Sequence, residues 1–143
     1  MKLNQSTLMA LLIISSLVIG CKSGLEVANE QFNLHEYAVA ALRYEKLLKD
    51  PKLSKLQKQT IAFQAGEAYR LNHDTKNALK MYAKSMVYGR KDSIVQFRKA
   101  EMLMRQQRYE EALDAFHRYK KDFPDDKDVD RLIAGCEMAL KNQ

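Results

Sequence analysis

Four aspartates lie close together near the end of the chain: Asp125, Asp126, Asp128 and Asp130. Alternating carboxylates of this kind begin a calcium-binding loop, which also needs Gly at its sixth position and Glu at its twelfth. Counted from Asp126, the sixth residue is Arg131 and the twelfth is Glu137. Because the glycine is missing, we do not expect calcium or another metal to bind here. Acids suit the first turn of a helix, because the helix dipole is positive at that end.

A thiol and an imidazole, Cys136 and His117, are the second candidate for chemistry. They could approach one another between neighbouring helices, but a Cys/His nucleophile also needs an oxyanion site and a cleft. The sequence contains no metal-ligand spacing, glycine-rich phosphate loop or nucleophile elbow. We therefore predict a buried, inert thiol, no enzymatic activity, no cofactor and no small-molecule substrate. His35 and His73 precede equivalent segments and are interpreted as turn residues.

Cys21 ends an apolar N-terminal segment, and its thiol is the third candidate. Lys2 is followed by an uncharged stretch whose apolar core, residues 8–19, is shorter than the roughly 20 residues of a transmembrane helix. Residues 17–21, LVIGC, resemble the bacterial lipobox, in which a small residue precedes a cysteine that is acylated before cleavage. The resemblance implies a lipoprotein signal peptide at residues 1–20 and a lipid on Cys21. A plain secretory signal and an uncleaved anchor are the alternatives.

The acyl chains on Cys21 would hold the protein at a membrane, because one chain binds marginally and two anchor stably. Lys22 stands where Asp would suggest inner-membrane retention, so we expect an outer-membrane anchor facing the periplasm. The inner membrane and the cell surface are the alternatives. The net charge is +6 at pH 7, and its basic residues are interleaved with acids, as on a solvated helical surface. We expect no nucleic-acid partner, and an attraction to anionic lipid headgroups fits the charge better.

Small and aromatic residues recur at fixed spacing in the second half of the chain. Tyr109, Ala112 and Phe116 lie on one face of a predicted helix, Ala100 lies in the helix before it, and Pro124 ends the unit. The small residues allow two helices to approach closely, and the rings fill the space beside them. This spacing resembles the tetratricopeptide repeat, a helix–turn–helix unit of 34 residues.

The same pattern occurs twice more upstream, which supports a true repeat. A shift of 34 residues leads to the second copy, and a further shift of 38 aligns the second helix of the first copy. We expect the four extra residues in the segment Asp50 to Lys55, where an insertion costs least. The predicted packing positions are Ala40, Tyr44, Gly66, Ala78, Tyr82, Ala100, Ala112 and Phe116.

The repeats predict an all-α fold: a right-handed superhelix of about three tetratricopeptide helix pairs and a C-terminal capping helix. Seven helices are expected, and Ser54 with Gln57 is predicted to form a capping box at the start of the third. The expected domain is 21–143, with repeats at about 22–53, 59–92 and 93–126 and the capping helix at 126–141.

The resemblance to tetratricopeptide repeats also implies a groove lined by the first helix of each pair, in which partner proteins bind. The implied groove residues include Phe63, Glu67, Arg70, Phe97, Glu101 and Arg105. We expect both phenylalanines to be exposed for binding, and packing against a neighbouring repeat is the alternative. The two glutamates favour a mixed or basic partner segment over a C-terminal carboxylate.

Two segments are similar to the N-terminal part of OmpA-family lipoproteins of Bacteroidetes: Ala65-Gly66-Glu67-Ala68-Tyr69-Arg70 and Gly135-Cys136. This similarity implies a membrane-anchored scaffold in the bacterial envelope, as part of a secretion, gliding or peptidoglycan-linked complex. The first alternative is a lipoprotein that assists the assembly of outer-membrane β-barrels. The second alternative is a small enzyme.

Overall fold

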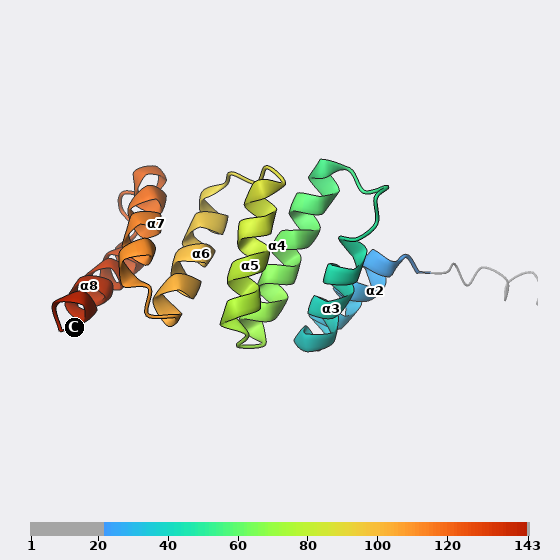
Figure 1. The fold of residues 1–143 in the computed structure, drawn as a ribbon, viewed down its shortest axis with the longest axis horizontal. Helices are drawn as coiled ribbons and strands as arrows, with labels where there is room; N and C mark the ends of the chain where they lie inside the picture. Colours follow the sequence, from blue (N-terminus) through green and yellow to red (C-terminus); the bar gives the residue numbers. More distant parts are fainter. Residues whose placement is uncertain (1–21, 143) are drawn as a thin grey trace, which may run out of the picture.

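The computed structural model describes residues 22–142, so the expected signal peptide and Cys21 lie outside the described residues. Within residues 22–142 the chain forms seven helices and no strand (Figure 1). They are α2 (Gly24–Asn33), α3 (Tyr37–Leu47), α4 (Lys55–Leu71), α5 (Thr75–Val87), α6 (Ser93–Arg105), α7 (Tyr109–Asp122) and α8 (Lys127–Lys141). The predicted all-α fold is confirmed, and no described helix is long and apolar enough to cross a membrane.

Polar side chains define where several helices begin. The capping box predicted for Ser54 and Gln57 is present at the start of α4, and Ser23 with Glu26 forms another at α2. In each box the two side chains satisfy backbone N–H groups that the first helical turn leaves free. Asp92 caps α6 by accepting a hydrogen bond from the N–H of Val95. The local sequence therefore sets these helix starts without tertiary contacts.

The turns inside the three pairs share one backbone conformation. His35, His73 and Gln107 each precede the second helix of a pair and have φ angles of 63°, 60° and 60°. Non-glycine residues adopt this left-handed region uncommonly. Its recurrence at equivalent positions shows that the three pairs turn in the same way, and that the two histidines are turn residues.

Consecutive helices pack against one another along the whole stack, from α2 to α8 (Figure 1). The buried side chains form two apolar clusters, one centred on α2 to α5 and the other on α6 to α8. Leu79 of α5 packs against both clusters and joins them. Helix α8 covers the last pair with Val129, Ile133 and Cys136, which are all buried.

All eight residues named for repeat packing are buried. The seven other than Gly66 are at most 1% exposed, and Gly66 is buried within α4. Ala28 of α2, which is also 0% exposed, occupies the equivalent position in the first pair. Each pair therefore places a small residue of its first helix beside a large aromatic residue of its second helix.

The four extra residues of the second repeat lie in a helix, not in the segment Asp50 to Lys55. Helices α4, α6 and α8 each begin 11 residues after the large aromatic residue of the preceding helix (44 to 55, 82 to 93 and 116 to 127). The loops are thus equal, whereas α4 has 17 residues and α6 has 13. The insertion is one extra turn at the start of α4, so the expected repeat boundary at residue 59 falls inside this helix. The hydroxyl of Ser85 donates to the carbonyl of Gln59 at 3.0 Å and holds this turn against α5.

Candidate partner-binding face

The first helices of the three pairs lie side by side and form one face of the molecule, which we call the first-helix face. Gln64 of α4 lies with its Nε2 atom 3.5 Å from Oδ1 of Asn29 of α2. Further along, the Nε atom of Arg98 of α6 lies 3.3 Å from a carboxylate oxygen of Glu67 of α4. Polar side chains therefore connect α2, α4 and α6 in sequence across this face.

A hollow of about 430 Å³ lies on the first-helix face between α2 and α4. We call it the α2–α4 pocket, and it is lined by Asn29, Phe32, Asn33, Tyr44, Phe63, Gln64 and Glu67. Two aromatic rings and three carboxamides therefore share one concave site. Such a combination suits a protein segment, because rings cover an apolar side chain while carboxamides both donate and accept hydrogen bonds.

Glu67 is at the centre of a polar network at the edge of this pocket. Its carboxylate accepts hydrogen bonds from Arg70 at 2.7 Å and from the hydroxyl of Tyr82 at 2.5 Å, and Arg98 lies 3.3 Å away. Burial raises the pKa of Glu67, but the hydrogen bonds from Arg70 and Tyr82 and the two guanidinium charges lower it more. The net effect is a pKa below the ordinary value, so this carboxylate is ionised and fully engaged.

Glu101 is engaged in the same network. The Nη1 atom of Arg98 donates to its carboxylate at 2.7 Å, and only 19% of the Glu101 side chain is exposed. Because arginines of this chain already neutralise Glu67 and Glu101, the two acids do not present free negative charge to a partner. The expected preference for a mixed or basic segment therefore loses its basis.

A hydrogen bond between the two helices of a pair recurs at one position of the repeat. Tyr44 donates its hydroxyl proton to Asn29 at 2.8 Å, as Tyr82 does to Glu67. Burial and the Glu67 charge raise the pKa of Tyr82, so its hydroxyl stays protonated as the donor. Phe116 occupies the equivalent position in the third pair and has no hydroxyl. Glu101, the equivalent acceptor, is instead held by Arg98 of its own helix.

Phe63 and Phe97 are half-buried, which differs from the expectation that both are exposed. The ring of Phe97 lies 5.8 Å from that of Phe116 and 5.0 Å from that of Tyr119. The ring of Phe63 lies 5.8 Å from that of Tyr82. Both rings therefore fill the space between helices, because the second helix of each pair brings an aromatic residue under them. The packing alternative describes Phe97, whereas Phe63 also lines the α2–α4 pocket.

The positions of the other groove residues differ from one another. Arg70 is occupied by its ion pair with Glu67, whereas Arg105 is exposed in the last turn of α6. Sequence reasoning missed Asn29, Gln64 and Arg98. The shift of 38 residues that aligns Tyr44 with Tyr82 also aligns Asn29 with Glu67, so the signal for Asn29 was present.

The other candidates for chemistry have structural roles in the described residues. Asp126 caps α8 by accepting from the N–H groups of Asp128 and Val129, as expected for acids at a helix start. No group of three or more metal-ligating side chains lies together within residues 22–142. Cys136 is 0% exposed, and burial raises the pKa of its thiol, whereas His117 is exposed on α7.

Comparison with known proteins supports the fold. The sequence matches no protein-family model and no curated protein sequence. The structure is similar to the C-terminal tetratricopeptide-repeat-containing domain of an FK506-binding protein from Plasmodium falciparum, with a TM-score of 0.68 and 19% identity. The match covers 83% of this chain and 87% of the other. The chain is therefore an all-α helical repeat protein with the tetratricopeptide fold.

Proposed function

We propose that this protein is a protein–protein interaction scaffold that binds a partner segment on its first-helix face. The observation that carries the proposal is the α2–α4 pocket of about 430 Å³, which opens on this face between two repeats. Phe32 and Phe63 supply apolar surface there, and Asn33 supplies an exposed carboxamide at the rim. The fold supports this function in general, because stacked helix pairs present an extended surface for other proteins.

The chemistry of the pocket favours an uncharged segment with one apolar or aromatic side chain. The Oε1 atom of Gln64 is buried and has no hydrogen-bond partner within the described residues. A backbone N–H of a bound segment would satisfy this oxygen and remove the cost of leaving it unpaired. Glu67, the only acid in the lining, is neutralised by Arg70 and Arg98, so charge attraction plays a minor part.

The proposal extends to a location in the bacterial envelope, with a lipid anchor on Cys21 that holds the scaffold at the outer membrane. Its support is the lipobox-like sequence LVIGC at residues 17–21 and the similarity to OmpA-family lipoproteins noted above. Helix α2 begins at Gly24, so an anchor at Cys21 would hold the repeats close to the lipid surface. A secretion, gliding or peptidoglycan-linked complex is the proposed setting, and a β-barrel assembly lipoprotein is the alternative.

Site-specific photo-crosslinking in cells tests the binding face. A photoreactive amino acid replaces Asn33 at the rim of the pocket, and the matched control places it at Val87, which is 77% exposed on α5. We expect a discrete cross-linked protein from residue 33 and none in common with residue 87. The same products from both positions, or none from residue 33, would overturn the proposed face.

The identity of the cross-linked protein separates the two envelope functions. Secretion or peptidoglycan-linked proteins support the proposed setting, whereas β-barrel assembly proteins support the alternative. Fractionation of Cys21→Ala cells tests the anchor separately, because loss of the acylated thiol should release the protein from membranes. Unchanged membrane association of this variant refutes the lipid anchor but leaves the binding face in place.

A further inference from the structure

A second hollow of about 430 Å³ lies away from the first-helix face, between α5 and α7 and above α6. We call it the α5–α7 hollow. Its apolar surface comes from Leu79 and Ala83 of α5 and Leu103 of α6. Leu79 is the residue that joins the two core clusters, so the hollow lies where the stack passes from one cluster to the next. None of its residues lines the α2–α4 pocket.

The rim of the α5–α7 hollow is strongly basic. Lys76, Lys80, Lys99 and Arg108 line it, and Glu111 is the single acid. Arg108 donates two hydrogen bonds of 2.7 Å to Glu111, which therefore offsets only one of the four cations. Three lysines remain around an apolar floor.

One further acid reaches this rim from α3. Glu45 lies 3.8 Å from Nζ of Lys80 and also accepts a hydrogen bond from Tyr69 at 2.9 Å. The side chain of Lys80 is 64% exposed, and an exposed pair at this distance is weak. Lys80 can therefore turn towards a ligand in the hollow at little cost.

We propose that the α5–α7 hollow is a second docking site, which binds an acidic protein segment carrying one leucine-like side chain. The apolar side chain enters between Leu79, Ala83 and Leu103, and flanking carboxylates pair with the lysines of the rim. Charge complementarity selects the acidic partner, since the rim carries an excess of positive charge. The apolar floor distinguishes a protein segment from a lipid headgroup, whose phosphate needs only the cations. The scaffold can thus hold two partners on separate surfaces.

Fluorescence anisotropy with labelled hexapeptides and the purified full chain tests this site. The probe is the peptide Glu-Asp-Leu-Leu-Asp-Glu, and the controls replace its two leucines with serine or its four acids with lysine. We expect saturable binding of the probe alone, which weakens as salt is raised. Failure of the probe to bind, or equal binding of the serine peptide, would overturn the proposal.

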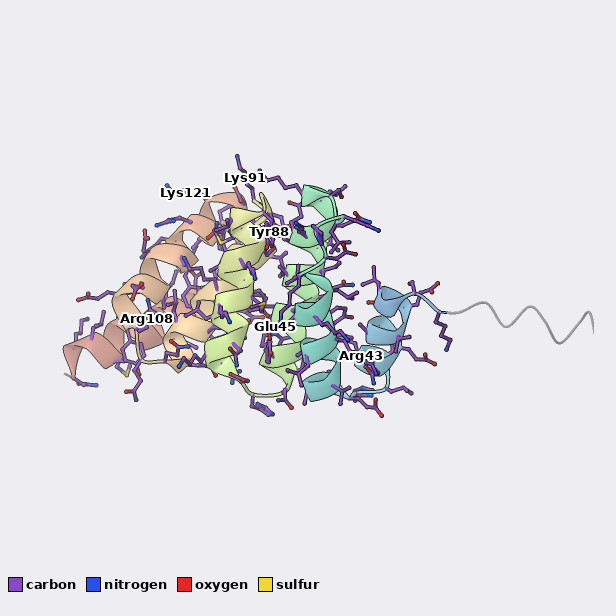
Figure 2. All side chains as sticks on the ribbon, turned by 45° about the vertical axis from the view of Figure 1, so that its right-hand side comes forward. Arg43, Glu45, Tyr88, Lys91, Arg108 and Lys121 are labelled. Carbon is purple, nitrogen blue, oxygen red and sulfur yellow. The ribbon has the colours of Figure 1, made fainter. Side chains whose placement is uncertain are left out.

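Charge reversal locates the binding on the molecule. Lys80→Glu with Lys99→Glu should weaken probe binding about tenfold or more, because two attractions become repulsions. The matched control is Lys91→Glu with Lys121→Glu, which changes the net charge equally at the opposite end of the helices from Arg108 (Figure 2). Equal losses in the two double variants would show attraction to overall charge only and would refute the site.

A neutral variant and a lipid control complete the test. Ala83→Gln covers the apolar floor without a change of charge and should also weaken probe binding, even if the charge reversal impairs folding. Vesicles of phosphatidylglycerol and phosphatidylcholine test the alternative ligand. Release of the chain from these vesicles by the Lys80/Lys99 change, with probe binding unaffected, would assign the hollow to lipid and overturn the proposal.

Discussion

The ring of Tyr82 lies directly against the backbone of Gly66. A Cβ atom built at residue 66 would be 2.6 Å from Cε1 of Tyr82 and 2.7 Å from Cδ1. No side chain separates the ring from α4 at this point, so the contact sets how closely α4 and α5 approach. In the third pair, Ala100 and Phe116 hold the equivalent positions and are both fully buried.

Gly66→Ala is expected to destabilise the protein by about 1–3 kcal/mol, because the new methyl overlaps a buried ring that has no space to move. Helix propensity alone predicts the opposite, since Ala is favoured over Gly in a helix interior by about 1 kcal/mol. Chemical denaturation measures the free energy of unfolding. Gly135→Ala is the matched control: a Cβ at residue 135 meets no atom within 4 Å, so this variant should be stabilised. A stabilised Gly66→Ala variant would contradict the close contact.

Glu67 should make the free energy of unfolding depend on pH in the acid range. Its pKa in the folded protein lies below the ordinary value of 4.5. Its contribution is therefore fully present above that value and is lost as the pH falls through the folded pKa. Glu67→Gln should cost about 1–3 kcal/mol at neutral pH, through weakened hydrogen bonds to Arg70 and Tyr82. The difference from the unmodified protein should shrink on acidification.

Urea denaturation at a series of pH values measures the effect of Glu67. Glu110→Gln, which removes an exposed carboxylate of α7, is the control and should change stability little at any pH. A constant difference between Glu67→Gln and the unmodified protein from neutral to acid pH would show that the network does not hold Glu67 ionised.

Phe97→Ala should reduce the free energy of unfolding by about 2–4 kcal/mol, because the half-buried ring packs on Phe116 and Tyr119. Phe123→Ala is the comparison variant: its ring is 48% exposed and stacks only on Tyr119 within the described residues. That contact is worth about 1 kcal/mol. Thermal melting of the two variants measures the difference, and equal losses would mean that Phe97 is no better packed than a surface ring.

Cys136 should resist thiol reagents in the folded protein. It is 0% exposed, and burial, with a smaller contribution from Glu137, raises the pKa of its thiol, while the thiolate is the reactive form. In a Cys21→Ala background it is the only cysteine, so labelling by iodoacetamide reports on it alone. Labelling should follow the fraction of unfolded protein in urea. Rapid labelling without urea would show that α8 does not cover the last pair.

Several features of the fold were predictable because they depend on residues near one another in the chain. The caps at Ser54 and the turns at His35 and His73 are local, and the recurrence of small and aromatic residues follows from helical geometry. The position of the extra turn was not predictable in this way. An insertion changes only the spacing between Tyr44 and Gly66, and either a longer loop or a longer helix gives the same spacing.

The sequence by itself determined that paired helices stack, since Gly66 and Tyr82 recur as Ala100 and Phe116 at one fixed interval. Only the tertiary structure decided which side chains meet across helices. Arg98 reaches Glu67 on another repeat, and this contact depends on the angle between α4 and α6, which no local pattern encodes. The same packing buries half of each groove phenylalanine and gathers the lysines of α5 and α6 around one apolar hollow. Periodicity along a chain specifies faces of helices, whereas the site depends on how those faces are brought together.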